Sequence, residues 1–496
     1  MVTTGAIIEA LGLVLNPQLL LVIFGISILG IILGALPGVG PTLAMALFFP
    51  FTFALDPVTG LVIMAVIYGS ATYGGSISAI LVNVPGTPGS AATLLDGYPM
   101  TRAGQGAVAI GISTMASFGG AVVGLILLAF FAPVLADISL LFGPPEFFWL
   151  AILGLSTVSA VSGDSLLKAL AAMSLGIFFA TIGVDPIRAQ PRFVFDTFYL
   201  QGGINLIVLL VGLFAISQSI ELALESNEDA TDASSQMQGN VWDGVKLAIS
   251  DWFGLIRGGV IGTVVGAIPG LGISAANFLS YLTAVNLSSH PETFGTGEPK
   301  GVVAAESANN GSAMGALIPA MALAIPGGAA AAVFIGVMLT YGITPGPNVF
   351  ETTLPYVVFI AILLGDIVML FVGLFGAKYI ARVTSLPNDV ILTSIVVFAL
   401  IGSFTVRNNI LDVGMALFFG LFGFLLARRG YSLISFILGF ILAPIAERGF
   451  QRALLISSGD YGIFFASPID ILLILLSVTF LLSPILLRLR SDSNAA

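Results

Sequence analysis

The chain is organised in long apolar stretches that carry almost no charge. Charge-free runs extend over residues 10–55, 103–136, 307–350 and 471–487. Each run is long enough for one or more helices of roughly 20 residues, the length that crosses a bilayer. The pattern therefore predicts an all-α, polytopic membrane protein with about 12 to 14 helical elements, a total that includes hairpins which do not cross.

Two segments interrupt the apolar pattern with glycine, proline and uncharged polar residues. In the first half, a helix over residues 19–36 runs into LPGVG, and a helix over residues 58–68 leads into YGGSISAILVNVPGTPGSAAT. The second half contains GAIPGLG from Gly266 and ESANNGSAMGALIPAMALAIPGG from Glu306. Proline removes an amide donor and glycine loosens the backbone, so we expect broken helices and re-entrant hairpins in both segments.

The corresponding positions of these segments predict two membrane repeats, at residues 1–224 and 251–496, which we expect to be inverted. A polar linker at residues 225–250 joins them, because ESNEDATDASSQMQGNVWD has too little apolar surface to pack. The excess of Lys and Arg in alternate short loops near the end of the chain places the C-terminal tail in the cytoplasm.

Composition narrows the possible functions. Only 8% of the residues are charged, against about a quarter in soluble domains, and 57% are hydrophobic. The chain has no cysteine and a single histidine, His290, so it offers no thiolate nucleophile and no histidine metal cluster. No basic surface for nucleic acid is visible, and the net charge is −10. We therefore expect no metal site, no cofactor and no enzymatic activity.

The broken segments are the candidate solute site. Irregular backbone persists in a membrane only where it is buried in protein or lines a wet cavity, and paired broken helices indicate a transporter's binding site. The alternative, that glycine and proline merely permit close helix packing, suits a single Pro-Gly pair better than four. The predicted substrate-binding residues are Pro37, Gly38, Gly40, Gly74, Gly75, Ser76, Ser78, Asn83, Pro85, Gly86, Thr87 and Ser90 in the first half and Pro269, Gly270, Asn309, Asn310, Ser312, Pro326 and Gly327 in the second.

The chemistry of this site follows from its lack of basic residues. Neither residues 57–95 nor residues 307–350 contain Lys or Arg. A bound anion would therefore be held by hydroxyl groups, amides and the N–H groups at helix N-termini, which carry partial positive charge. This donor set suits a carboxylate.

Two acidic residues are candidates for binding a coupling proton or sodium ion. Glu306 immediately precedes SANNGS, and Asp366 lies alone within LLGDIVML. Intramembrane acids are costly and usually functional. Two alternatives remain open: Glu306 at a helix start near the membrane surface, and Asp366 as a hydrogen bonder between helices. Asp96 and Arg102 are expected to flank a helix end in a solvated cytoplasmic turn.

Several motifs strongly resemble the large membrane subunit of the tripartite tricarboxylate transporters. They are LPGVGPTLAMALFFPFTF, YGGSISAILVNVPGTPGSAATLLDGYPM, GVDPIRAQPRFVF, ESANNGSAMGALIPAMALAIPGG and YGITPGPNVF, and the similarity covers nearly the whole chain. The resemblance implies a secondary uptake system of the cytoplasmic (inner) membrane. An extracytoplasmic solute-binding protein would deliver a carboxylate such as citrate, a small membrane subunit would complete the complex, and a proton or sodium gradient would drive transport.

Departures from the family pattern leave the substrate open. Gly89 stands where the first motif commonly has serine, and Gly327-Gly328-Ala329-Ala330-Ala331 lacks the hydroxyls of the second motif. Citrate, another tricarboxylate, a dicarboxylate and an aromatic carboxylate all remain candidates. We expect alternating access with an elevator-like motion in contact with membrane lipid, and homo-oligomerisation stays open. A membrane-embedded enzyme and a passive channel are the rival hypotheses.

Overall fold

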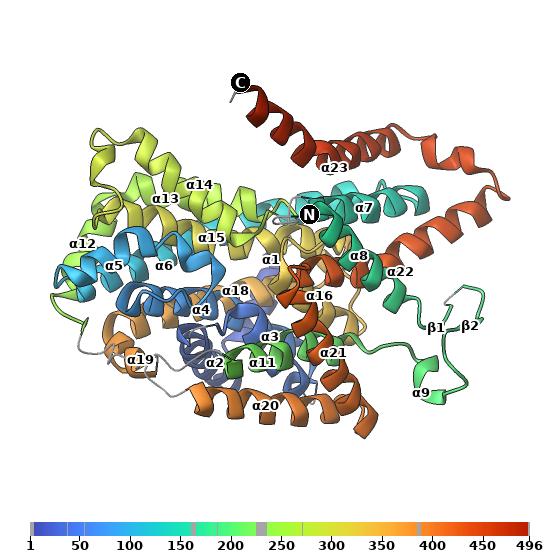
Figure 1. The fold of residues 1–496 in the computed structure, drawn as a ribbon, viewed down its shortest axis with the longest axis horizontal. Helices are drawn as coiled ribbons and strands as arrows, with labels where there is room; N and C mark the ends of the chain where they lie inside the picture. The colour runs from blue at the N-terminus through green and yellow to red at the C-terminus, as the bar shows by residue number, and fades with distance from the viewer. Residues whose placement is uncertain are drawn as a thin grey trace.

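The computed structural model describes residues 4–36, 38–53, 55–159, 165–185, 187–224, 236–269, 271–383 and 388–494. In this part of the chain, seven helices are long and apolar enough to cross a membrane, or eight if a pair of helices bent by 78° forms one span. Figure 1 shows a molecule built almost entirely of helices, with one short two-stranded hairpin. The predicted all-α polytopic class is confirmed.

The elements up to residue 224 begin with four apolar helices and the first broken segment. They are α1 (Thr4–Val14), α2 (Pro17–Ala35), α3 (Pro41–Thr52), α4 (Pro57–Val82), the 3₁₀ turn η1 (Pro88–Ala91), α5 (Leu94–Arg102), α6 (Gly106–Ser139), α7 (Pro144–Ser156), η2 (Thr157–Ser159), α8 (Leu166–Ala180), the antiparallel strands β1 (Gly183–Val184) and β2 (Pro191–Arg192), α9 (Phe198–Gln201), α10 (Leu206–Leu210), the π-helical turn η3 (Val211–Ile216) and α11 (Ser217–Leu224).

The elements after residue 235 contain the second broken segment and the C-terminal spans. They are α12 (Val241–Ser250), α13 (Trp252–Gly266), α14 (Gly272–Leu287), η5 (Pro291–Thr293), α15 (Pro299–Leu323), α16 (Ala329–Thr340), α17 (Pro347–Phe350), α18 (Leu354–Phe371), the π-helical turn η6 (Val372–Gly376), α19 (Ala377–Val383), α20 (Asn388–Thr405), α21 (Ile410–Arg428), α22 (Leu433–Ile456), η7 (Tyr461–Phe465) and α23 (Pro468–Asn494).

Helix α4 continues through the segment that the sequence pattern predicts to be irregular. Its glycines serve close packing, since a Cβ atom at Gly74 would lie 2.4 Å from the carbonyl oxygen of Ile31 on α2. A continuous helix satisfies its backbone hydrogen bonds internally, as a buried segment must. The expected break after residue 68 is therefore wrong. The helix ends at Asn83, whose φ of 59° and ψ of 25° are left-handed.

Helix α15 repeats this behaviour in the second half. It continues through ESANNGSAMGALIPAMAL and ends at Ala324, whose φ of 58° and ψ of 24° nearly equal those of Asn83. Each left-handed residue stands two positions before a Pro-Gly pair. We call residues 83–90 the first Pro-Gly loop and residues 324–328 the second Pro-Gly loop.

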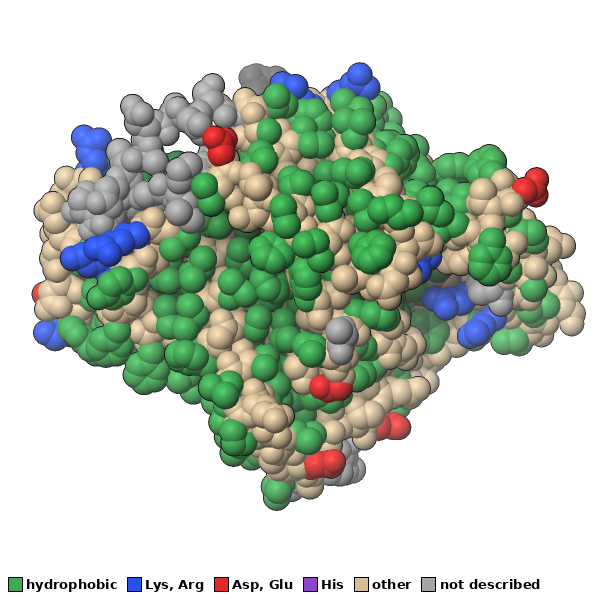
Figure 2. Space-filling model, turned by 90° about the horizontal axis from the view of Figure 1, so that it is seen from below, with side chains coloured by type: hydrophobic (Ala, Val, Ile, Leu, Met, Phe, Trp, Pro, Cys, Tyr) green, Lys and Arg blue, Asp and Glu red, His purple; other side chains and the backbone are tan. Residues whose placement is uncertain are grey.

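Helices α4 and α15 lie in the interior of the molecule. The apolar window of α4 is entirely buried by protein, whereas only about a third of the corresponding window of α6 is buried. Helix α15 packs against α6, α13 and α14, and α4 packs against α2, α3 and α18. The face in Figure 2 carries many apolar side chains and only a few charged ones. The two helices that carry the loops are thus shielded from lipid.

The two Pro-Gly loops are flanked by reciprocal contacts between the halves. Helix α3, which follows LPGVG, packs against α16, which follows the second Pro-Gly loop. Helix α14, which follows IPGLG, packs against η1, within the first Pro-Gly loop. In both cases, the helix that follows the first Pro-Gly pair of one half contacts the element that follows the second Pro-Gly pair of the other half.

The predicted linker falls in two parts. Residues 225–235 lie outside the described residues. Residues 241–250 form α12, which packs closely on α6, because a Cβ atom at Gly244 would lie 2.0 Å from the carbonyl oxygen of Val108.

Candidate functional site

Glu306 is the centre of a buried polar cluster that joins three helices and one turn. Its side chain is fully buried. The hydroxyl group of Ser76 on α4 donates a 2.6 Å hydrogen bond to Oε2, and that of Ser117 on α6 donates a 2.9 Å bond to the same atom. The hydroxyl group of Thr93 donates to Oε1. Since α15 begins at Pro299, the interpretation of Glu306 as a charge at a helix start is wrong.

The charge of Glu306 has no basic partner among the described residues. The ion pairs in this part of the chain involve other acids. Burial of an unpaired carboxylate costs several kcal/mol, which hydroxyl donors offset only in part. A proton or a sodium ion at this position would remove the charge. The oxygen atoms of Ser76, Thr93 and Ser117 lie within hydrogen-bond reach of the carboxylate and can also coordinate a hard cation.

The first Pro-Gly loop is held against its own helix. The backbone N–H of Gly86 donates to the carbonyl oxygen of Gly75 at 3.2 Å. A Cβ atom at Gly86 would lie 2.5 Å from the carbonyl oxygen of Gly34 and 2.7 Å from the Cα atom of Gly75. Thr87 and Ser90 share a 2.7 Å hydroxyl–hydroxyl bond. Glycine is therefore required at position 86.

The first Pro-Gly loop also meets the second half of the chain. The carbonyl oxygen of Gly89 accepts a 2.6 Å hydrogen bond from the side-chain amide of Asn277 on α14. The same amide lies 3.2 Å from Oδ1 of Asn309, and Asn309 donates to the carbonyl oxygen of Thr72 on α4 at 3.3 Å. The buried Oδ1 atom of Asn277 has no hydrogen-bond partner among the described residues. The sequence analysis missed Asn277, although an amide within an apolar helix is itself a signal.

The second Pro-Gly loop has a matching anchor in its own half. A Cβ atom at Gly327 would lie 2.4 Å from the carbonyl oxygen of Gly266 and 2.7 Å from the Cα atom of Ala316. Ile325 packs with Leu150 of α7. The described contacts of the two loops run to different neighbours, and direct contact between Pro85-Gly86 and Pro326-Gly327 is not among them. A shared cavity between the two loops stays a prediction.

The other predicted residues of the first half have mainly local roles. Gly38 has a left-handed φ of 77°, and a Cβ atom at Gly40 would lie 3.8 Å from the Thr87 methyl group. Ser78 donates to the carbonyl oxygen of Gly75 within α4. Asn83 is exposed, and its position at the end of α4 requires a residue that tolerates left-handed geometry. Pro37, and Gly270 in the second half, lie outside the described residues.

Asn310 and Asp366 approach the same turn of α4. The side-chain amide of Asn310 donates to the carbonyl oxygen of Gly69 at 3.3 Å, and a Cβ atom at Gly69 would lie 3.2 Å from Oδ1 of Asp366. Asp366 is only 2% exposed, and its Oδ2 atom and the Oδ1 atom of Asn310 have no hydrogen-bond partner among the described residues. Ser312 donates within α15, and Pro269 is partly buried.

Comparison with known proteins identifies the family. The model of the tripartite tricarboxylate transporter TctA family matches residues 19–438. The chain belongs to this family. It is 36% identical over 473 residues, 94% of this chain and 93% of the other, to an uncharacterized 52.8 kDa protein of the TAR-I ttuC' 3' region of Agrobacterium vitis. It is 33% identical over 235 residues, 47% of this chain and 97% of the other, to an uncharacterized protein of the TAR-II ttuC' 3' region of the same organism.

TctA membership establishes the general function. The chain is the large membrane subunit of a tripartite transporter, which works with a small membrane subunit and a solute-binding protein. The multi-pass membrane location agrees with the apolar helices.

Asp96 connects the two halves of this TctA chain. It is 1% exposed, so its predicted place in a solvated turn is wrong. Its Oδ1 atom accepts the backbone N–H groups of Gly295, Gly297 and Glu298 at 2.7–2.9 Å, and its Oδ2 atom accepts the hydroxyl of Tyr281 at 2.9 Å. Through these hydrogen bonds, the carboxylate links α5 to α14 and to the loop between α14 and α15.

Replacing Asp96 by Ala is expected to destabilise the TctA chain by roughly 3 kcal/mol, because bonds to a charged acceptor contribute about 1.5–3 kcal/mol each and are not additive. Arg102→Ala, an exposed position on the same helix, is the matched control. Thermal unfolding in detergent, followed by intrinsic fluorescence, should show a clearly lower midpoint for Asp96→Ala alone. Equal midpoints for the two variants would contradict the role assigned to Asp96.

A cavity beside the second Pro-Gly loop of the TctA chain is lined by two arginine residues. Its volume is about 530 Å³, and it is lined by Leu323 and Ala324 at the end of α15 and by Arg448 and Arg452 of α22. The two arginines are four residues apart and so lie on one face of α22. The sequence pattern gives no sign that this pair borders the second Pro-Gly loop, because α22 comes much later in the chain than the loop.

Proposed function

We propose that the chain is the permease subunit that imports a carboxylate together with a proton or a sodium ion. An extracytoplasmic solute-binding protein delivers the carboxylate, and the small membrane subunit completes the complex in the cytoplasmic membrane, with the C-terminal tail of this chain in the cytoplasm. The observation that carries the proposal is the buried, unpaired carboxylate of Glu306 next to the first Pro-Gly loop.

The coupling between the two solutes follows from electrostatics. The hydroxyl group of Thr93 donates to Glu306, and the backbone N–H of Thr93 donates to the carbonyl oxygen of Ser90 at 3.1 Å. A charged Glu306 therefore lies one turn of backbone away from the first Pro-Gly loop and repels a carboxylate bound there. A proton or a sodium ion on Glu306 removes this repulsion. Each solute thus favours binding of the other, which is the condition for cotransport.

Uncharged donors bind the carboxylate in this proposal. The amide of Asn309 and the hydroxyl groups of Thr87 and Ser90 border the first Pro-Gly loop. Arg448 and Arg452 attract the anion to the cavity at the second Pro-Gly loop without binding it permanently. Citrate, another tricarboxylate, a dicarboxylate or an aromatic carboxylate is the cargo.

Alternating access in this proposal arises from two inverted repeats. The equivalent anchors of Gly86 and Gly327 and the nearly equal geometry of Asn83 and Ala324 support the repeats. Reciprocal packing of α3 with α16 and of α14 with η1 is the pattern expected of two repeats related by a two-fold axis. The interior helices α4 and α15, shielded from lipid, would carry the site past a lipid-facing scaffold in an elevator-like motion.

Uptake by the reconstituted three-component system tests the proposal. Vesicles that contain both membrane subunits, supplied with the binding protein, should accumulate a radiolabelled carboxylate under an imposed sodium or proton gradient, but not under both equally. Uptake that is independent of any gradient would instead indicate a channel. Chemical conversion of the carboxylate without uptake would indicate an enzyme.

Replacing Arg452 by Glu is expected to raise the apparent KM for uptake by roughly tenfold, because reversal of a charge at a cavity mouth changes local anion attraction by about 1–2 kcal/mol. The maximal rate should change little. Arg382→Glu is the matched control, because Arg382 is exposed and stacked on Tyr379. Equal KM values for the two variants would show that Arg452 does not attract the substrate.

A further inference from the structure

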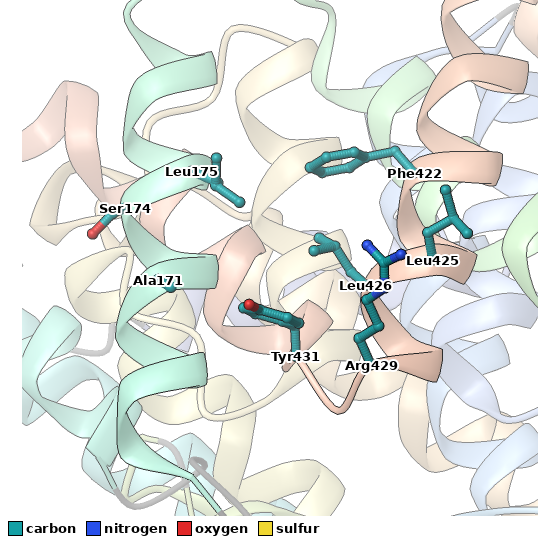
Figure 3. Close-up of a pocket in the computed structure, with 8 residues that line it drawn as sticks. All are labelled: Ala171, Ser174, Leu175, Phe422, Leu425, Leu426, Arg429 and Tyr431. Atoms are coloured by element: carbon teal, nitrogen blue, oxygen red, sulfur yellow. The ribbon is translucent and has the colours of Figure 1, made fainter.

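A groove between α8 and α21 combines apolar walls with a basic end. Its volume is about 570 Å³. Figure 3 shows Leu175 of α8 and Phe422 of α21 facing one another across it, with Tyr431 toward one end and the guanidinium group of Arg429 beside Leu425 and Leu426. Leu425 on the wall is 43% exposed. In a membrane protein such a surface is in contact with acyl chains.

The basic end of the groove carries two cationic side chains with free donors. The Lys168 ammonium donates a 2.7 Å hydrogen bond to the carbonyl oxygen of Arg429 and lies 5.8 Å from the ring centre of Tyr431. An ammonium group has three N–H donors, so this one hydrogen bond leaves donors for a ligand. Both Lys168 and Arg429 are exposed, and neither forms an ion pair with an acid among the described residues.

The length of the groove fits one leaflet of a bilayer. From Arg429 to Phe422 helix α21 rises about 10 Å, at 1.5 Å per residue, within the roughly 15 Å of hydrocarbon that one leaflet provides. Beyond the groove, the ring of Phe179 lies 5.7 Å from that of Phe422. Tyr431 lies at the opposite end, as aromatic residues commonly do at the membrane surface.

We propose that this groove is a binding site for an anionic phospholipid. The phosphate group binds between Lys168 and Arg429, and one acyl chain lies between α8 and α21. Charge complementarity selects the lipid, because two cations without acidic partners attract an anionic head group more strongly than a zwitterionic one. The apolar walls select a lipid over a free phosphate ion. Neither the membrane location nor the transport function requires such a selective site.

Native mass spectrometry of the purified full-length protein tests this proposal. The protein in detergent is mixed with equal amounts of phosphatidylglycerol and phosphatidylcholine. The unmodified protein should retain phosphatidylglycerol about tenfold better. The double variant Lys168→Gln/Arg429→Gln should lose this preference, whereas Lys378→Gln, an exposed lysine outside the groove, should keep it. A preference that survives in the double variant would overturn the proposal.

A second variant separates the acyl-chain contact from the head-group contact. Ala171→Trp fills the groove from an exposed position on α8 and leaves both basic residues in place. It should reduce retention of phosphatidylglycerol by about tenfold, to the level of the double variant. Unchanged retention would show that the lipid does not enter the groove. If Ala171→Trp released the small membrane subunit from the purified complex and left lipid retention unchanged, the groove would be a binding site for that subunit. This result would also overturn the proposal.

Discussion

Replacing Glu306 by Gln is expected to lower gradient-driven uptake by roughly 10- to 100-fold while the protein remains folded. Gln has nearly the same shape and keeps hydrogen-bonding partners in Ser76, Thr93 and Ser117. It carries no charge, so it takes up no proton near neutral pH and binds a sodium ion much more weakly than a carboxylate does. Charge-assisted bonds contribute about 1.5–3 kcal/mol, which corresponds to a roughly 10- to 100-fold loss of coupled uptake.

Two transport assays check this expectation. Net uptake under an imposed gradient should fall in Glu306→Gln, whereas exchange of internal for external carboxylate should persist, because exchange needs the substrate site but no cation release. Glu292→Gln, which makes the same change at a position with a 70% exposed side chain, is the control. Net uptake at the normal rate and with unchanged cation dependence would exclude Glu306 as the coupling residue.

The same substitution at two adjacent glycines of the second Pro-Gly loop should be damaging at Gly327 and nearly neutral at Gly328. Gly327→Ala places a methyl group 2.4 Å from the carbonyl oxygen of Gly266, and backbone atoms cannot move aside cheaply. Gly328 has an extended backbone and no neighbouring atom within 4 Å of an added methyl group. We expect Gly327→Ala to lower stability by about 1–3 kcal/mol and uptake by at least tenfold, with little effect of Gly328→Ala.

Uptake and thermal unfolding should be measured on both glycine variants together. The pair controls for expression, insertion and the loss of a glycine as such, because only the surroundings of the added methyl group differ. If Gly328→Ala proved as damaging as Gly327→Ala, chain flexibility rather than close packing would be the property that matters in this loop.

The membrane class and most helices could be predicted from the sequence because they depend on local composition. The predicted helix over residues 19–36 corresponds to α2, which spans Pro17–Ala35. The end of α4 could not be predicted so well. Glycine and serine resemble a loop when they are read locally, but in α4 they pack against α2 and Glu306, and those neighbours are known only from the fold.

The site could be predicted only where one residue carries a strong signal by itself. Glu306 stands out as an acid in an apolar segment. Its partner Ser76 lies 230 residues away, and Ser117 lies 189 residues away. A single sequence contains no sign that these groups meet. Asp96 was misjudged for the same reason, because the loop that buries it, at residues 295–298, comes 199 or more residues later.

The long separation between Glu306 and its hydroxyl partners affects how the chain matures. Helices α4 and α6 enter the bilayer during synthesis well before α15 is made. Until then, the hydroxyl groups of Ser76 and Ser117 lie among apolar side chains without the carboxylate that later accepts their hydrogen bonds. We therefore expect the newly made first half to be less stably packed until α15 joins α4 and α6. A ribosome stalled before residue 306 should leave an intermediate that membrane proteases degrade readily, and completion of α15 should make it resistant.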